Sequence, residues 1–397
     1  MATSSLAFFD QLQGQSYQSL SAANFQLGIV DPDDALLTNT QISSLESTGK
    51  SLIAYLSIGE AEDYRSYWQA SWNTSPPSFL LGQDPNWPGN YNVEYWNPAW
   101  QSIIINEATA LAKAGYNGMM LDVVDAYTVS AVAAAAGGIA NARADMVSFV
   151  EAIAAATKAI NPNFRIIQNN ALDLLTVNPD DPTSATNTAY LSHIDGVVAE
   201  STFYDGNTPT TWQAGNVQYL EHAVSAGKDV LAIDYPTTAA AQQSFVTQAI
   251  ADHFVPFIGA PNLDSIPAAN SQIAGELPSG ALAELTGSSG GTVTPPPVAA
   301  YNIYNVPSGT QTIAATMTNE EFVFSSAYHG NATINYFGAD VGDIISLSSS
   351  IYSTAAQALS HVTYSGSNAI VHLAGTDTIT IAGAGANSIV AADFHIG

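Results

Sequence analysis

The sequence predicts an α/β fold, a (β/α)8 TIM barrel followed by a small β-rich C-terminal domain. In roughly the first 280 residues, short apolar runs alternate with helical stretches such as 98–115 and 144–160, and Met146, Phe149 and Ile153 recur at helical spacing in the second stretch. Eight such runs fit a barrel of this class, whose usual length is about 250 residues. The predicted strands are residues 6–12, 25–30, 51–59, 118–125, 164–170, 196–202, 229–235 and 254–260.

Downstream of the predicted barrel the chain changes character. Residues 287–299, GSSGGTVTPPPVA, form a Gly/Ser patch followed by three prolines, a composition typical of a semi-rigid spacer. We therefore predict a barrel domain over residues 1–286, a linker over 287–299 and a β-rich domain over 300–397. In the last region, short apolar runs are separated by Gly, Asn, Asp and Ser. It has no cluster of titratable side chains, so we expect an accessory or targeting module.

Charge and composition exclude several classes of protein. Seven Lys and Arg stand against 34 Asp and Glu, and the net charge of -27 repels nucleic acid and anionic membranes but allows a cationic partner. No apolar run approaches the roughly 18 residues of a membrane span, and the first residues lack the pattern of a cleaved export signal. Cysteine is absent, which excludes disulfides, thiolate metal sites and a cysteine nucleophile.

The familiar cofactor and metal motifs are also missing from the sequence. There is no P-loop, no G-x-G-x-x-G after a strand and no H-E-x-x-H, and the seven histidines are scattered singly. We therefore expect neither a metal site nor a cofactor. One formal G-x-S-x-G runs from Gly287 to Gly291, but it lies in the predicted linker and lacks the strand-to-helix elbow that would expose its serine.

Polar residues follow nearly every predicted strand. In a barrel, the carboxyl ends of the strands open onto one face, where barrel enzymes keep their chemistry. A polar residue at a single strand end can merely mark that end. Carboxylates and amides at most of the ends favour a functional site instead. The residues concerned are Asp10, Gln11, Asp31, Gly59, Glu60, Asp122, Asp125, Gln168 to Asn170, Glu200, Asp234 and Tyr235.

Carboxylates in such a cleft suit the cleavage of glycosidic bonds. This reaction needs one carboxylic acid to protonate the leaving oxygen and a second carboxylate to attack the sugar or to activate water. Asp122 and Glu200, on the fourth and sixth predicted strands, are the best candidates for the catalytic pair. Asp125 is the nearest rival of Asp122. Strand alternation places Asp125 on the opposite face from Asp122, unless the strand ends before it.

An aromatic segment follows the third predicted strand. Residues 84–100, DPNWPGNYNVEYWNPAW, are too irregular for a strand or helix, and we expect a long loop at the barrel mouth. Its aromatic side chains could stack on sugar rings or could seal a hydrophobic lid over the barrel, and both interpretations stay open. Those side chains are Trp87, Tyr91, Tyr95, Trp96 and Trp100.

Eight segments, in order, resemble one family. They are FFDQLQG, YLSIGEAEDYRSYW, DPNWPGNYNVEYWNPAW, AGYNGMMLDVVDAY, IIQNNALDLL, IDGVVAESTFY, LAIDYP and FVPFIGAPNLDSI. Together they resemble the endo-α-1,4-polygalactosaminidases of glycoside hydrolase family 114, which have a (β/α)8 fold. The resemblance implies that Asp122 and Glu200 are catalytic. It also implies a partly de-N-acetylated, cationic galactosamine polymer as substrate, whose free amines cannot replace a protein nucleophile. Further implied cleft residues are Glu60, Arg65, Asp125, Asn169, Tyr204, Asp234 and Tyr235.

The last 60 residues resemble the C-terminal secretion domains of bacterial type I exported proteins. This likeness implies an extracellular protein, exported by type I secretion machinery through an uncleaved C-terminal signal. Glycine-rich nonapeptide repeats of the form G-G-x-G-x-D often precede such domains and are missing here, so calcium binding is not implied.

Two classes of function are compatible with the sequence. The first is a secreted, endo-acting glycoside hydrolase that cleaves α-1,4-linked galactosamine-containing polysaccharide with a carboxylate pair, and that binds it through Trp87, Tyr91, Trp96, Tyr204 and the polar cleft residues. The second is a non-catalytic polysaccharide-binding or cell-surface structural protein on a barrel scaffold. The fold alone does not decide between them, because one fold can host many functions. The presence of both Asp122 and Glu200, the two carboxylates that the reaction needs, favours the enzyme.

Overall fold

The computed structural model describes residues 6–275, 282–286, 302–314, 320–335, 344–352, 355–366, 368–373, 375–382, 389 and 394–396. The chain divides into two compact units, residues 1–293 and 294–397, which are described separately. The predicted linker 287–299 lies outside the described residues. Among the described residues, no helix is long and apolar enough to cross a membrane.

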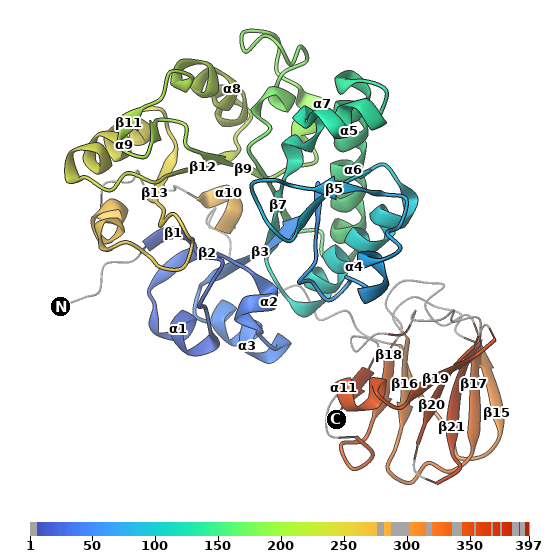
Figure 1. Cartoon of the computed structure of the whole chain (residues 1–397). Coiled ribbons are helices and arrows are strands. Elements are labelled where there is room, and N and C mark those ends of the chain that lie inside the picture. The colour runs from blue at the N-terminus through green and yellow to red at the C-terminus, as the bar shows by residue number, and fades with distance from the viewer. Residues whose placement is uncertain are drawn as a thin grey trace. The chain divides into compact units, whose positions relative to one another are not determined.

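The first unit is built on eight parallel strands arranged as a nearly closed barrel (Figure 1). Their order in the sheet follows their order in the chain, as expected of a (β/α)8 barrel. The last strand meets the first through the rings of Phe8 and Phe257, whose centroids are 5.4 Å apart. The strands are β1 (Leu6–Asp10), β2 (Phe25–Val30), β3 (Ser51–Ser57), β7 (Gly118–Asp122), β8 (Arg165–Asn169), β9 (Gly196–Glu200), β12 (Asp229–Asp234) and β13 (Val255–Ile258).

Helices cover the outside of the barrel, so its strands are buried on both faces and read as near-continuous apolar runs. The longest, α6, starts five residues before the predicted stretch 144–160. Asn97 caps the start of α4, Pro98 is the first residue of the helix, and Gly115 ends it in a left-handed conformation. The helices are α1 (Tyr17–Ala22), α2 (Pro32–Ala35), α3 (Asn39–Glu46), α4 (Pro98–Ala114), α5 (Ser130–Ala135), α6 (Ile139–Ile160), α7 (Thr188–Leu191), α8 (Gln213–Ser225), α9 (Ala239–Ala251) and α10 (Ala283–Thr286).

Short elements decorate the loops that follow the barrel strands. After β3, the strands β4 (Glu60–Glu62), β6 (Asn90–Val93) and β5 (Leu80–Gln83) form a three-stranded antiparallel sheet in that order. The expectation that residues 84–100 form an irregular loop is therefore wrong in part, because this segment contains all of β6 and the start of α4. A second small hairpin, β10 (Tyr204–Asp205) with β11 (Thr208–Pro209), follows β9.

The second unit is rich in β structure, as predicted. Its first five strands alternate between two sheets, and each strand pairs in parallel within its own sheet. A separate core fills this unit, with Phe322, Phe324, Ile334 and Ile379 fully buried. The elements are β14 (Asn302–Asn305), β15 (Gln311–Ala314), β16 (Glu320–Phe324), β17 (Asn331–Asn335), β18 (Ile344–Leu347), α11 (Ala355–Leu359), β19 (Val362–Ser365), β20 (Asn368–His372), β21 (Thr378–Ala382) and β22 (Phe394–Ile396).

Candidate active site

Two carboxylates and one amide meet at the carboxyl ends of β7, β8 and β9. These strands are neighbours in the barrel, and they end at Asp122, Asn169 and Glu200. The Nδ2 of Asn169 donates to Oδ1 of Asp122 at 2.8 Å and to Oε2 of Glu200 at 2.9 Å. Two oxygens bound to one nitrogen can be no further apart than the sum of those distances, about 5.7 Å. The two residues proposed from the sequence as a pair therefore face each other across a single amide.

Asp122 is held from three sides. Its Oδ2 accepts a hydrogen bond from the Tyr55 hydroxyl at 2.8 Å, and its Oδ1 accepts from the Val123 backbone N–H at 2.8 Å as well as from Asn169. All three partners donate to its oxygens. Tyr55 was not among the residues proposed from the sequence, because an apolar strand such as β3 gives no signal that one of its aromatic side chains reaches a carboxylate on β7.

Glu200 has a different environment. Its Oε1 accepts from the Tyr235 hydroxyl and its Oε2 from Asn169. Burial, followed by the negative charge of Asp122, raises the pKa of Glu200, and the hydrogen bond from Tyr235 partly opposes this. The raised pKa suits Glu200 to hold a proton, although Tyr235 and Asn169 both donate to it. A carboxyl group with a raised pKa is what general-acid catalysis requires.

The backbone turns sharply directly after each of the three strands. Val123, Asn170 and Ser201 have φ angles of 58°, 51° and 49°, in the left-handed region that non-glycine residues seldom adopt. For the β-branched Val123 this conformation is strained, and such strain clusters at functional sites. Because β7 ends at Asp122, strand alternation does not extend to Asp125, which lies in the 3-10 helix Val124–Thr128.

Asp125 and Asp234 lie in the same region but differ in their contacts. Burial, followed by the charge of Asp122, raises the pKa of Asp125 to about 6. Asp234, fully buried, accepts from the backbone N–H groups of Thr202, Phe203 and Tyr204 at 3.0, 2.9 and 2.6 Å. It therefore holds the segment that follows Glu200, and both its oxygens are used for this.

Asp10 is a further carboxyl at the barrel mouth. It ends β1, its exposed fraction is 2%, and its Oδ1 has no hydrogen-bond partner among the described residues. Burial, then the charges of Glu200 and Asp122, raise the pKa of Asp10 well above its usual range. In the sequence, Asp10 was one of many polar residues at the ends of predicted strands. Nothing in the sequence distinguished it from the others.

Glu60 begins the small sheet beside the pair. It is buried, and its Oε2 accepts from Asn90 Nδ2 of β6 at 3.2 Å. Burial raises the pKa of Glu60 to about 7, with further contributions from nearby Asp84 and Asp122. The antiparallel pairing of β4 with β6 thus fixes this carboxyl near Asp122.

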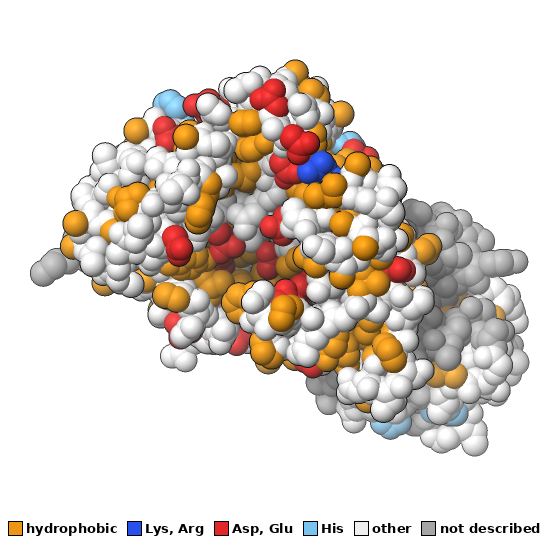
Figure 2. All heavy atoms as spheres, turned by 45° about the horizontal axis from the view of Figure 1, so that its top comes forward, with side chains coloured by type: hydrophobic (Ala, Val, Ile, Leu, Met, Phe, Trp, Pro, Cys, Tyr) orange, Lys and Arg blue, Asp and Glu red, His pale blue; other side chains and the backbone are white. Residues whose placement is uncertain are grey.

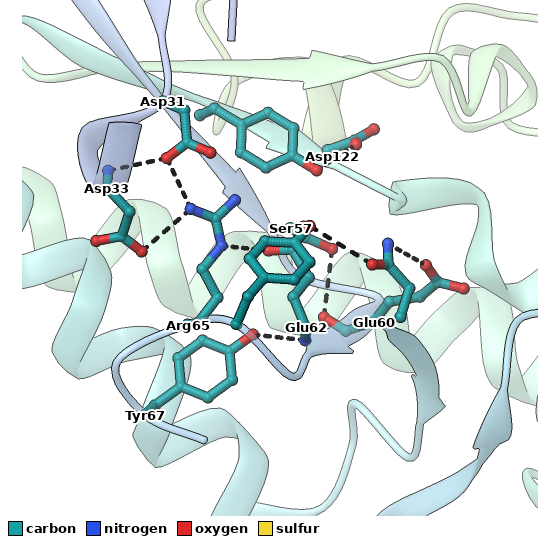
Figure 3. A network of polar contacts seen from close by, with 11 residues as sticks. Asp31, Asp33, Ser57, Glu60, Glu62, Arg65, Tyr67 and Asp122 are labelled. Atoms are coloured by element: carbon teal, nitrogen blue, oxygen red, sulfur yellow. Dashed lines mark hydrogen bonds and ion pairs between the residues drawn. The ribbon is translucent and has the colours of Figure 1, made fainter. Parts of the chain in front are cut away.

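Arg65 is enclosed by acidic side chains (Figure 3). Its guanidinium contacts Asp31 at 2.6 Å, Glu62 at 2.6 Å and Asp33 at 3.1 Å, and its side chain is 9% exposed. It also lies 5.4 Å from the centre of the Tyr55 ring, which donates to Asp122. The sequence grouped Arg65 with substrate-binding residues. In the structure, three carboxylates of the protein pair with the Arg65 guanidinium. The same guanidinium packs against Tyr55, the tyrosine that donates to Asp122.

The aromatic residues of 84–100 divide between the core and the surface. Tyr95 and Trp100 are fully buried, and the Trp100 indole N–H donates to the Ile58 carbonyl at 2.9 Å. Trp87 is 65% exposed, and Tyr91 packs against Trp68 with ring centroids 4.9 Å apart. Residues 84–100 thus contribute buried aromatic side chains to the core of the barrel and also an exposed one, Trp87, to its surface.

Trp96 and Tyr204, two other aromatic residues proposed from the sequence, are held by packing. Trp96 packs edge-on against Tyr95, with ring centroids 5.1 Å apart. Tyr204 is buried at the start of β10, and its backbone N–H donates to Asp234.

The face shown in Figure 2 is hollowed, and acidic side chains gather around the hollow, whereas Lys and Arg side chains show at one place. Within the described residues, no group of three or more His, Asp or Glu side chains is arranged to hold a metal ion. The arrangement at the pair offers carboxyl groups, amides and tyrosine hydroxyls, which support acid and nucleophile chemistry on a polar ligand.

Comparison with known proteins extends these observations. The sequence matches Glycoside-hydrolase family GH114 over residues 4–273. An uncharacterized protein of Deinococcus radiodurans is 36% identical over 264 residues, which cover 64% of this chain and 80% of that protein.

Among solved structures, Aspergillus fumigatus Ega3 in complex with galactosamine is similar with a TM-score of 0.51 and 19% identity, covering 66% of this chain and 94% of that chain. The glycoside hydrolase domain of PelA from Pseudomonas aeruginosa has a TM-score of 0.49 and 20% identity, covering 66% and 96%. The likeness to Ega3 supports the barrel fold, and the family match, which spans more than half of the chain, shows that this protein belongs to glycoside hydrolase family GH114.

Proposed function

We propose that this protein is an endo-acting glycoside hydrolase that cleaves α-1,4-linked, galactosamine-containing polysaccharide, with Glu200 as general acid and base and Asp122 as nucleophile. The observation that carries the proposal is the bridge formed by Asn169, which holds both carboxyl groups at the barrel mouth at 2.8 and 2.9 Å. The raised pKa of Glu200 and the three donors around Asp122 support this assignment of roles.

The reaction then follows in two steps. Glu200 gives its proton to the glycosidic oxygen while an oxygen of Asp122 attacks the anomeric carbon, and the leaving chain departs with a free hydroxyl. Glu200, now ionised, takes a proton from water, which attacks the same carbon and releases Asp122. The upper limit of about 5.7 Å between the bridged oxygens agrees with retaining glycosidases, whose carboxyl groups are about 5–5.5 Å apart, rather than with the 6.5–9.5 Å of inverting ones. We therefore expect retention of the α configuration.

Two observations support the choice of substrate. The barrel unit, residues 1–293, holds 28 Asp and Glu against 7 Lys and Arg, a net charge of -21 that favours a cationic chain. The fold is similar to that of Ega3, whose structure was solved with galactosamine bound. A free 2-amino group also cannot act as the internal nucleophile that an acetamido group provides, so the reaction needs a carboxylate such as Asp122.

Release of reducing ends from de-N-acetylated α-1,4-polygalactosamine tests the proposal. Asp122→Asn and Glu200→Gln should each fold normally and lose several orders of magnitude in rate, while Asp125→Asn should lose less. NMR of the first product should show the α anomer. Mild and equal losses at all three positions would remove the pair from the mechanism. A wild-type protein that binds the polymer without cutting it would favour the alternative, a non-catalytic polysaccharide-binding protein.

We also propose that the second unit is a targeting module for type I secretion, which would place the protein outside the cell. The alternation of its first strands between two sheets, and its separate core, support a module that folds by itself. Deletion of residues 300–397 should abolish export and leave hydrolysis by the purified barrel nearly unchanged. Continued secretion of the truncated protein would contradict the targeting role, and an inactive barrel would contradict the independence of the two units.

A further inference from the structure

Asp10 is one of the carboxyls at the barrel mouth that the proposed mechanism leaves unused. It is 2% exposed, and its Oδ1 meets no hydrogen-bond donor in the described part of the chain. A buried polar atom without a partner costs free energy, so native proteins seldom keep one without a reason. The charges of Glu200 and Asp122 act on Asp10, and Asp10 in turn acts on Tyr235, the tyrosine that donates to Glu200. Asp10 ends β1 as Asp122 and Glu200 end β7 and β9, so its carboxyl lies at the same end of the barrel as the catalytic pair.

Asp234 provides a contrast within the same barrel. It also ends a strand and is fully buried, but three backbone N–H groups satisfy its two oxygens. The fold therefore supplies donors where a buried aspartate has a structural task. It supplies none to Oδ1 of Asp10, so a structural task does not account for this residue.

A second acceptor at the pair is also unpartnered. The Oδ1 of Asn169 is buried without a hydrogen-bond partner among the described residues. Its orientation is fixed, because Nδ2 must face the two carboxylates to which it donates. Asp10 and Asn169 end β1 and β8, so both unpartnered acceptors lie at the carboxyl end of the barrel, and a ligand that satisfies them has to donate.

We propose that Asp10 selects the free amino group of the sugar at the cleavage point by binding its 2-ammonium group. This inference rests on the proposed function and names the group that the site recognises. An ammonium offers three N–H donors and a positive charge, which suits an aspartate beside two further carboxyl groups. A sugar hydroxyl offers one donor and no charge, and an acetamido group offers one N–H and a bulky acyl group.

Kinetics with two matched oligomers test the selection. Asp10→Asn should lower kcat/KM for a de-N-acetylated α-1,4-galactosamine oligomer by about 100-fold, the size of effect expected for the loss of a hydrogen bond to a charged group. For the N-acetylated oligomer, kcat/KM should change by less than about threefold. Equal losses on both oligomers, or no loss on either, would overturn the inference. Asp205→Asn, which removes an exposed carboxylate from β10, is the control for charge alone and should change neither value by more than about twofold.

A binding measurement separates this inference from the proposed function, because it does not need turnover. At constant ionic strength, galactosamine should raise the Tm of the wild type more than galactose or N-acetylgalactosamine does. The extra increase should disappear in Asp10→Asn and persist in Asp205→Asn. A wild type that binds galactosamine without cleaving any polymer would contradict the proposed hydrolase while upholding the role of Asp10. Equal stabilisation by all three sugars would overturn the role of Asp10.

The Tm of the unliganded variant is a further check. If Asp10 is a binding residue without a protein partner, Asp10→Asn should fold and melt at the same temperature as the wild type or above it, as is common when a residue is kept for function at a cost in stability. A Tm well below that of the wild type would mean that Asp10 has a structural partner, which contradicts the inference.

Discussion

Tyr235 controls the acid of the proposed mechanism. Its hydroxyl donates to Oε1 of Glu200, and this hydrogen bond lowers a Glu200 pKa that burial and Asp122 have raised. In Tyr235→Phe the opposing contact is gone, so the pKa of Glu200 rises further and the acid keeps its proton to higher pH. We expect the alkaline limb of the kcat/KM profile to move to higher pH in this variant.

The matched control is Tyr219→Phe, because the Tyr219 hydroxyl donates to the Pro179 carbonyl on another part of the barrel. Its pH profile should coincide with that of the wild type. The two limbs of the pH profile report the titration of Asp122 and Glu200 as a coupled pair rather than of one residue. The variant is therefore compared with the wild type by the direction in which the alkaline limb moves. An alkaline limb that moves to lower pH in Tyr235→Phe would contradict the assignment of Glu200 as the acid.

At single positions, the sequence predicted which residues lie at the site better than it predicted their hydrogen-bond and ion-pair partners. Asp122 and Glu200 could be found because each carboxylate ends an apolar strand, and Asn169 lies at the end of the strand between them. The partners of Arg65 could not be found, because its three carboxylates come from the β2–α2 connection, α2 and β4. The same limit applies to Asp10, whose lack of a donor depends on the tertiary structure.

At the scale of elements, the loops after β3 and β7 approach each other at a glycine. A Cβ on Gly59 would lie 2.1 Å from the backbone oxygen of Val123, the residue that follows Asp122. Backbone cannot move aside as a flexible side chain can, so Gly59→Ala should displace the end of β7. We expect a loss of about 1–3 kcal/mol in the free energy of unfolding and at least a tenfold loss of kcat.

Gly215→Ala is the matched control for this substitution. A Cβ on Gly215, in α8, would meet nothing within 4 Å. Alanine is the better helix former, so this variant should gain up to about 0.5–1 kcal/mol and keep its activity. Urea denaturation and initial rates measure both quantities. Full activity in Gly59→Ala would mean that the position of Asp122 does not depend on this contact.

The elements predicted from the sequence were those with a strong apolar pattern. All eight barrel strands lie within their predicted ranges, because strands buried on both faces read as apolar runs. The three-stranded sheet of β4, β6 and β5 was missed. Its strands are three to four residues long and lie among Pro, Gly and Asn, so no alternation is long enough to detect, and their pairing is set by contacts with the barrel.

At the scale of the whole molecule, the distribution of charge allows a test of substrate recognition. Of the net charge of -27, the residues of the barrel unit contribute -21, and residues 294–397 contribute six carboxylates and no Lys or Arg. The barrel mouth itself collects Asp10, Glu60, Asp122 and Glu200, and the acidic side chains around the hollow in Figure 2 agree with a negative field there. Such a field should attract a protonated amino-sugar chain and raise its rate of encounter.

Salt should weaken this attraction. The Debye length falls from about 30 Å at 0.01 M to about 4 Å near 0.5 M, so KM for the de-N-acetylated polymer should rise markedly over that range. KM for a fully acetylated, neutral polymer should change little, and this polymer is the control for general effects of salt on the protein. The barrel without residues 300–397 should respond as the full chain does, because it keeps most of the charge. If KM for the cationic polymer does not depend on salt, the acidity does not select the substrate, and recognition rests on contacts such as exposed Trp87 and half-buried Tyr91.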